Sequence, residues 1–117
     1  MPKRILSVSY DQSLLRTRQQ ILESKGHTVT SACGLTNALE HCDSDTPFDL
    51  FILGHSIPHA EKESLIEHFR AKRPAAQVVA LKRIGEEYVT GADLLIEPNP
   101  RELLDAVNLI SGRGGIA

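Results

Sequence analysis

Aromatic residues are scarce in this chain. Tryptophan is absent, and only three Phe and two Tyr occur among the 117 residues. A surface that stacks the bases of single-stranded nucleic acid needs more aromatic rings than this. Thirteen Lys and Arg stand against 15 Asp and Glu, which gives a formal net charge of −2 and no basic surplus. We therefore expect that this domain binds no nucleic acid.

Long apolar runs, a leader segment and paired cysteines are also missing. The longest strictly apolar runs, such as Leu50 to Leu53, are far shorter than the ~20 residues of a membrane-spanning helix. No charged and then apolar leader opens the chain, so no export signal is visible. Cys33 and Cys42 are isolated thiols that form neither a C-x-x-C pair nor a disulfide framework. We expect no membrane association and a cytoplasmic location, because free thiols persist in reducing compartments.

Short apolar runs alternate with helical stripes along the chain. The expected strands are residues 5–8, a weaker one within 27–32, and 50–53, 78–81 and 94–96. Asp11 suits the N-cap of the first helix, and Asn99, followed by Pro100 and Glu102, suits the start of the last. The alternation predicts an α/β fold, a three-layer doubly wound five-stranded parallel sheet in the order 2-1-3-4-5.

The length of the chain favours a single domain. We assign residues 1–111 to this domain and residues 112–117 to a flexible tail or the start of a linker. Between the fourth and fifth strands only residues 83–90 are available for a helix, and Gly85 interrupts them. We therefore expect a shortened fourth helix.

Several segments, in this order and spacing, resemble the receiver domain of two-component response regulators, the CheY-like family with the flavodoxin-like fold. The resemblance covers residues 3–110. The segments that carry it are Arg4–Val8, Phe48–Pro58, Arg73-Pro74, Gly91–Asp93, Glu97-Pro98 and Arg101–Leu104.

The resemblance also shows what this chain has changed. Receivers hold Mg²⁺ with an acidic pair after the first strand, where this chain has Ser9 and Tyr10. Gly54 stands at the position of the phosphoaccepting aspartate, Lys82 at the Ser/Thr after the fourth strand, and Glu97 at the lysine after the fifth. Mg²⁺ prefers carboxylate oxygens, and phosphoryl transfer depends on charge neutralisation. The resemblance thus implies a degenerate pseudo-receiver with no catalytic residue, metal or cofactor, which is not an enzyme.

These changes predict a phosphorylation-independent receiver-like signalling domain of a two-component phosphorelay that acts by protein–protein interaction. The partner would be another signalling protein: a histidine kinase, a regulator or an output domain. A homodimer is left open. The output face of the family maps onto Tyr88, Val89, Leu94, Glu97 and Arg101, and Leu94 stands at the position of the family's switch aromatic.

Two other functions are left open. The first is a small-ligand or anion sensor that uses the vacated active-site pocket around Ser9, Tyr10, Gly54, His55 and Lys82. The second is a working phosphoacceptor that uses Asp11 or Asp49 in place of the missing aspartate.

Two pairs of side chains near the strand ends give further hypotheses. Lys82 and Glu97 follow neighbouring strands, so we hypothesise that they form an ion pair across the empty pocket and hold it in one state; the alternative is two solvent-exposed charges. His55 and His59 have the H-x-x-x-H spacing of some zinc sites, but Pro58 lies between them and argues against a regular helix there. We expect two surface histidines and no metal.

Overall fold

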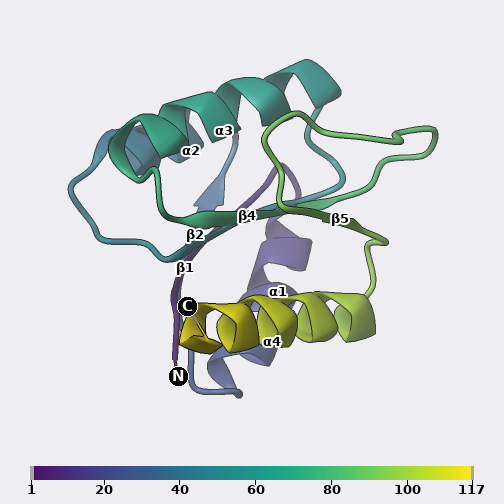
Figure 1. Ribbon diagram of the computed structural model, residues 1–117. Helices are drawn as coiled ribbons and strands as arrows, with labels where there is room; N and C mark the ends of the chain where they lie inside the picture. The colour runs from purple at the N-terminus through teal and green to yellow at the C-terminus, as the bar shows by residue number, and fades with distance from the viewer. Residues whose placement is uncertain (1, 117) are drawn as a thin grey trace.

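The computed structural model describes residues 2–116 of the chain and the side chains of residues 2–110. A five-stranded parallel sheet forms the middle layer (Figure 1). Its spatial order, β2-β1-β3-β4-β5, confirms the predicted one. The strands are β1 (Arg4–Ser9), β2 (Thr28–Cys33), β3 (Leu50–Leu53), β4 (Gln77–Leu81) and β5 (Leu94–Ile96).

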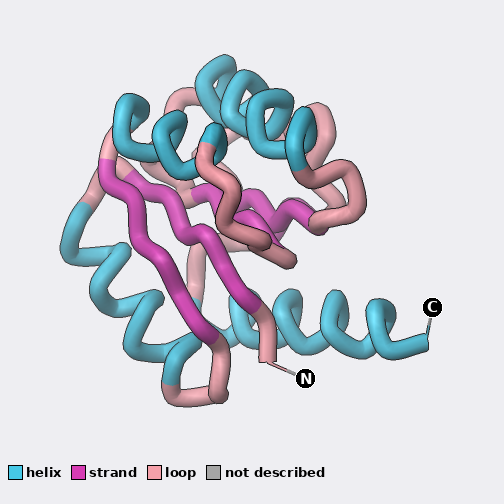
Figure 2. The backbone as a smooth tube through the Cα atoms, turned by 90° about the vertical axis from the view of Figure 1, so that its left-hand side faces the viewer, coloured by secondary structure: helices cyan, strands magenta, loops and turns pink. Residues whose placement is uncertain are grey.

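Helices cover both faces of the sheet. Figure 1 shows α2 and α3 on one side, and α1 and α4 on the other. Figure 2 shows the same three layers from the side, with the sheet between the two helix pairs. The helices are α1 (Gln12–Glu23), α2 (Leu35–Asp43), α3 (His59–Lys72) and α4 (Pro100–Ile116).

Side-chain caps begin two of these helices as predicted. The carboxylate of Asp11 accepts the backbone N–H of Leu14 at 3.1 Å. Asn99 accepts the N–H of Glu102 at 2.9 Å and donates its amide to the carboxylate of Glu102 at 3.0 Å. Each cap satisfies a donor that the first helical turn cannot pair internally.

Each face of the sheet has its own apolar core. Phe51 and Phe69 stack at 4.3 Å in the core beneath α2 and α3. Leu22, Val107 and Ile110 pack on the opposite face, beneath α1 and α4. Cys42 is fully buried in the first of these cores. Because both faces are covered, β3 is buried throughout, which is the reason for its continuous apolar run.

The helix predicted between β4 and β5 is not formed. Residues 82–93 are turns and irregular loop, and the label α4 belongs to the final helix. Gly85 and Gly91 have positive φ values of 83° and 91°, a conformation that ends a helix. A Cβ at Gly91 would also lie 2.8 Å from Ile66 of α3. The loop therefore packs too close to α3 for a side chain at that position.

The backbone of α4 is helical to Ile116. The predicted tail, residues 112–117, lies outside the described side chains, and the division at residue 111 stays a prediction. Among the described residues, no helix combines the length and the apolar composition needed to cross a bilayer.

Candidate functional site

The carboxyl ends of the strands meet at one edge of the sheet, where ligands bind in folds of this kind. A hollow of about 780 Å³ lies there. His55 and Ser56 after β3, Lys82 and Arg83 after β4, and Glu97 after β5 line it. Lys82 and Glu97 from the degenerate phosphotransfer positions, and His55 from the alternative ligand pocket, thus lie at the same edge of the sheet.

Arg18, from the middle of α1, fills the space beside Gly54. Arg18 is only 7% exposed. A Cβ added to Gly54 would lie 2.9 Å from Nη1 of Arg18 and 3.1 Å from Oγ of Ser9. Glycine at position 54 is therefore what gives the guanidinium its place.

The guanidinium of Arg18 has few partners. Nη2 lies 3.4 Å from Nδ1 of His55, which is long for a hydrogen bond. Nη1 is buried and has no hydrogen-bond partner among the described residues. Burial lowers the pKa of Arg18, and attraction from Asp11 opposes this shift. The site thus holds a buried cation that forms no ion pair with a carboxylate among the described residues.

Two serine hydroxyls lie next to this cation. Ser9 is fully buried, and its Oγ lies 3.1 Å from Oγ of Ser56. Ser9 Oγ accepts the N–H of Asp11 at 3.0 Å, and Ser56 Oγ accepts the N–H of Tyr10 at 3.2 Å. The hydroxyls therefore fasten the loop after β1 to the loop after β3.

Tyr10 is held against α3. Its hydroxyl donates to the carboxylate of Glu61, and its ring packs against the core beneath α2 and α3. Burial, followed by the contact with Glu61, raises the pKa of Tyr10 above its ordinary value. This carboxylate is thus occupied by a phenol.

The residues at this edge do not fit magnesium. Ser9, Ser56 and Arg18 offer two hydroxyls and a cation, whereas Mg²⁺ is held by carboxylate oxygens. Among the described residues, no three His, Cys, Asp or Glu side chains gather closely enough to hold a metal ion. The guanidinium beside Gly54 would also repel a divalent cation.

Lys62 and Glu86 form a second buried charged group, which the sequence did not reveal. Lys62 is fully buried, and its Nζ donates to the carboxylate of Glu86 at 2.5 Å and to the carbonyl of Leu81 at 2.7 Å. Burial lowers the pKa of Lys62, and Glu86 opposes this shift. The pair ties α3 to the loop that replaces the expected helix.

His59 extends this network. Its Nδ1 lies 2.7 Å from one oxygen of Glu86, and its Nε2 lies 3.2 Å from Glu63. Glu63 in turn accepts the N–H of Thr90 at 2.8 Å. Both ring nitrogens of His59 are thus engaged within the protein, and His55 contacts Arg18 instead.

The residues predicted for the output face differ in accessibility. Tyr88 is 69% exposed, while Val89 is buried in the core and unavailable to a partner. Leu94 is half-buried and packs towards the core beneath α4. Glu97 and Arg101 are exposed.

The predicted output face did not include Ile84, whose side chain is fully exposed in the loop between β4 and β5.

The hypothesised ion pair between Lys82 and Glu97 is absent among the described residues, although both line the hollow. Asp11 caps α1. Asp49 precedes β3 at the other end of the sheet, where it accepts the N–H of Arg4 at 2.9 Å. Asp49 is therefore remote from the strand ends.

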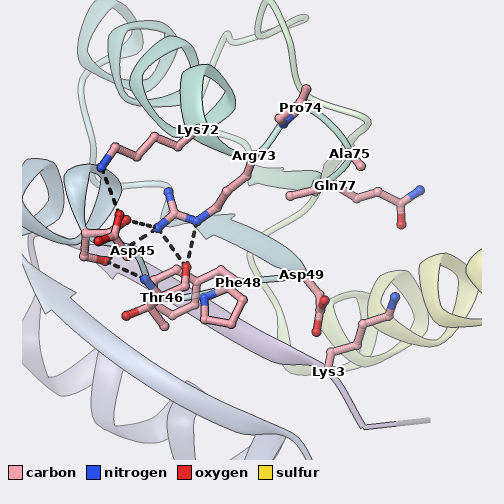
Figure 3. A pocket seen from close by; sticks show the side chains of 13 residues that line it. Lys3, Asp45, Thr46, Phe48, Asp49, Lys72, Arg73, Pro74, Ala75 and Gln77 are labelled. Atoms are coloured by element: carbon pink, nitrogen blue, oxygen red, sulfur yellow. Dashed lines mark hydrogen bonds and ion pairs between the residues drawn. The ribbon is translucent and has the colours of Figure 1, made fainter.

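A hollow of about 920 Å³ lies at the opposite end of the strands (Figure 3). Arg73 lies in its wall and donates to the carbonyls of Cys42, Ser44 and Thr46 at 2.7–3.0 Å. The rings of Phe48 and Phe69 lie 5.2 and 5.1 Å from its guanidinium carbon. These contacts close the carboxyl end of α2, so Arg73 is a structural residue.

In comparisons with known proteins, no family model and no curated sequence matches the chain. Solved structures do match. A CheY-like receiver domain from Methanospirillum hungatei is 28% identical, with a TM-score of 0.76 over 92% of each chain. The receiver domain of a LuxO-type repressor from Vibrio parahaemolyticus has a TM-score of 0.81 at 18% identity, over 99% of this chain and 95% of that one.

A third match is the response regulator TrrA from Thermotoga maritima, solved with Mg²⁺ and BeF. It is 23% identical, with a TM-score of 0.74 over 91% of this chain and 96% of that one. This chain therefore has the fold of a response regulator receiver domain.

Proposed function

We propose that the protein is a pseudo-receiver that takes part in two-component signalling by binding another protein, without being phosphorylated. What supports this most is the guanidinium of Arg18 beside Gly54. It occupies the space in which a phosphorylated receiver would need an acidic acceptor and a divalent cation. The absence of an acceptor carboxylate there makes phosphoryl transfer to this site chemically unsupported.

The loop between β4 and β5 is the surface we propose for the partner, a histidine kinase, a regulator or an output domain. Ile84 and Tyr88 present large apolar side chains on it. Glu97 lines the same hollow as this loop and is exposed, and Arg101 is exposed in the first turn of α4. The buried pair of Lys62 and Glu86 fixes the loop to α3. A fixed loop suits a surface that is always available, since a partner then loses little affinity to ordering the loop.

Two measurements test the two halves of this proposal. After incubation with acetyl phosphate and Mg²⁺, we expect the intact mass to stay unchanged, while a phosphorylatable receiver treated in parallel gains one phosphoryl group. A gain of mass in this chain would contradict phosphorylation independence.

For the partner surface, the wild-type chain serves as bait against the purified histidine kinases and regulators of the same cell. We expect Ile84→Ser with Tyr88→Ser to lose at least about tenfold in affinity, because buried apolar anchors carry most binding energy. Leu109→Ser is the matched control, since Leu109 is 52% exposed on α4, away from this loop. Equal loss in the control, or no loss in the loop variant, would count against the surface.

The alternative of a ligand sensor is favoured by one specific observation. Arg18 places an unsatisfied cationic donor beside Ser9, Gly54 and His55.

A further inference from the structure

The region around the ends of β1 and β3 carries several positive charges and few free carboxylates. Arg18 and His55 lie within 3.4 Å of each other, and Lys82 lines the same hollow as His55. The nearby carboxylates already have partners: Glu61 binds the phenol of Tyr10, and Glu86 binds Lys62. Asp11, whose charge attracts Arg18, caps the first turn of α1.

Two further carboxylates, Glu87 and Glu97, lie on the rim of the hollow and are exposed. Water screens exposed charges of this kind.

The unpaired nitrogen of Arg18 indicates that a hydrogen-bond acceptor is missing. A guanidinium carries five N–H donors in a planar fork that matches two oxygens of a carboxylate or phosphate. Here Nη1 is buried and finds no partner within the described part of the chain, and Nη2 makes one long contact at 3.4 Å. Burying a donor without a partner is costly, so the side chain would gain from an oxyanion that supplies acceptor oxygens.

The two serine hydroxyls have a donor to spare. Their mutual contact of 3.1 Å uses one hydroxyl hydrogen. Each oxygen already accepts a backbone N–H, so the second hydroxyl hydrogen is free to donate to a ligand. Ser9 and Ser56 thus add one neutral donor to the cation.

His55 connects this cation to solvent. Its ring lines the hollow of about 780 Å³ and contacts Nη2 of Arg18. Burial and then the positive charges of Arg18 and Lys62 lower the pKa of His55, opposed by Asp11. Among the described residues this long contact is the hydrogen bond recorded for the Arg18 side chain, so a movement of its guanidinium towards the hollow would break only that bond.

We propose that this end of the domain binds a small oxyanion, of the phosphate or carboxylate type, through the guanidinium of Arg18, with one hydroxyl of the Ser9–Ser56 pair as a further donor. The site is non-covalent, and binding draws the guanidinium from beneath Gly54. An anion bound there would change the contacts of His55 and Ser56 in the loop after β3, without any phosphoryl transfer to the protein. The inference does not depend on the proposed partner surface.

The test uses inorganic phosphate and acetate as probes at constant ionic strength, with calorimetry and thermal unfolding as readouts. We expect phosphate to bind the wild-type chain and raise its unfolding midpoint. Arg18→Met should weaken binding about tenfold or more, the effect of losing a charge-assisted hydrogen bond. Arg16→Met is the matched control, because Arg16 is exposed on the same helix, and it should bind as the wild type does.

The outcomes separate the possible sources of the anion. Phosphate binding that depends on Arg18 supports a free inorganic or ester phosphate, while acetate binding alone supports a carboxylate side chain of a partner. Equal binding by Arg18→Met and the wild type, or no binding of either probe, overturns the proposal. Unchanged partner capture by the variant Ile84→Ser with Tyr88→Ser, together with intact phosphate binding, would instead reject only the proposed partner surface.

A second measurement covers the case in which Arg18→Met fails to fold. In the unmodified chain, phosphate should shift the NMR signals of the Arg18 side chain and the His55 ring together. Shifts confined to other residues would overturn the proposal. Arg18→Lys keeps the charge but not the planar fork, so it should bind phosphate more weakly than the wild type and more tightly than Arg18→Met.

Discussion

Two arginines are buried to the same degree at opposite ends of the sheet, but their hydrogen bonding is very different. Arg73 is 9% exposed, and its donors reach the carbonyls of Cys42, Ser44 and Thr46. Arg18 is 7% exposed and has a single long contact. Burial alone therefore does not reveal the role of a cation: a saturated guanidinium is a structural tie, while an unsatisfied one indicates that a partner is missing.

Lys62 is an intermediate case. It is the most buried of the three cations, and it has one carbonyl and one carboxylate as partners. Its contacts fix the loop between β4 and β5, so the pair performs the anchoring that a helix would otherwise provide. The three cations thus form a series: Arg73 has a structural role, Lys62 is intermediate, and Arg18 has donors that remain available to a ligand.

The largest effect is expected at Arg73. Arg73→Met leaves several buried carbonyls without donors, and we expect a loss of about 4 kcal/mol in the free energy of unfolding. Urea unfolding measures it. Lys72→Met is the neighbouring control, since Lys72 is exposed and should contribute less than about 1 kcal/mol. If the two variants lost equal stability, the structural role of Arg73 would be wrong.

The next effect is expected at Lys62. Lys62→Met leaves the carboxylate of Glu86 buried without its cation, for which we expect a loss of about 3 kcal/mol. The double variant Lys62→Met, Glu86→Leu should recover most of it. Hydrogen exchange in residues 83–91 should rise in the single variant and fall back in the double.

Lys82→Met is the control for this series, because Lys82 has no ion pair among the described residues. Loop exchange that rises equally in the control would show that the buried pair does not anchor the loop.

At Arg18 we expect the change in the free energy of unfolding to have the opposite sign. Removing an unpaired buried cation removes a desolvation cost, so Arg18→Met should raise the free energy of unfolding by about 1 kcal/mol. Gly54→Ala should lower it by about 1–2 kcal/mol in the wild type, because its Cβ meets the guanidinium. In the Arg18→Met background this loss should shrink, and additive effects of the two changes would refute the coupling.

The smallest effect is expected in acid. Burial would raise the pKa of Glu86, but hydrogen bonds from Lys62, His59 and the N–H of Arg83 outweigh it, and the net pKa lies below its usual value. Its contribution to stability is therefore complete above the ordinary glutamate pKa of about 4.3 and is lost as the pH falls through the folded-state pKa. The urea unfolding midpoints of the wild type and Glu86→Gln should converge once the pH lies below the folded-state pKa of Glu86. Parallel curves would argue against the assignment.

The strands and helix starts could be predicted because their signals are local. Apolar runs, the cap at Asp11 and the capping box at Asn99 depend on neighbouring residues only. The absence of acidic groups at Ser9 and Gly54 was equally visible. The burial of Arg18 and Lys62 could not be predicted in this way, since a charged residue in a helix is normally assigned to the solvent-exposed face.

A signal for them does exist in the helical spacing. Arg18 lies three residues after Leu15 and four before Leu22, on the buried stripe of α1. Lys62 lies three residues before Leu65 on the buried stripe of α3. A cation at a stripe position requires a long-range partner, and that partner is set by tertiary structure. The missing helix has a local cause as well, since Gly85 and Gly91 adopt positive φ values, and the pair of Lys62 and Glu86 then holds the resulting loop against α3.

The two cysteines differ in a way that makes the molecule easy to label. Cys33 ends β2 opposite Ser9 and is exposed, whereas Cys42 is buried, and burial raises the pKa of its thiol to about 11. Since the thiolate is the reactive form, maleimide or iodoacetamide reagents at neutral pH should modify Cys33 and spare Cys42. The native chain thus offers a single attachment point for a fluorophore or spin label at the rim of the strand ends, and no engineered cysteine is needed to follow events there.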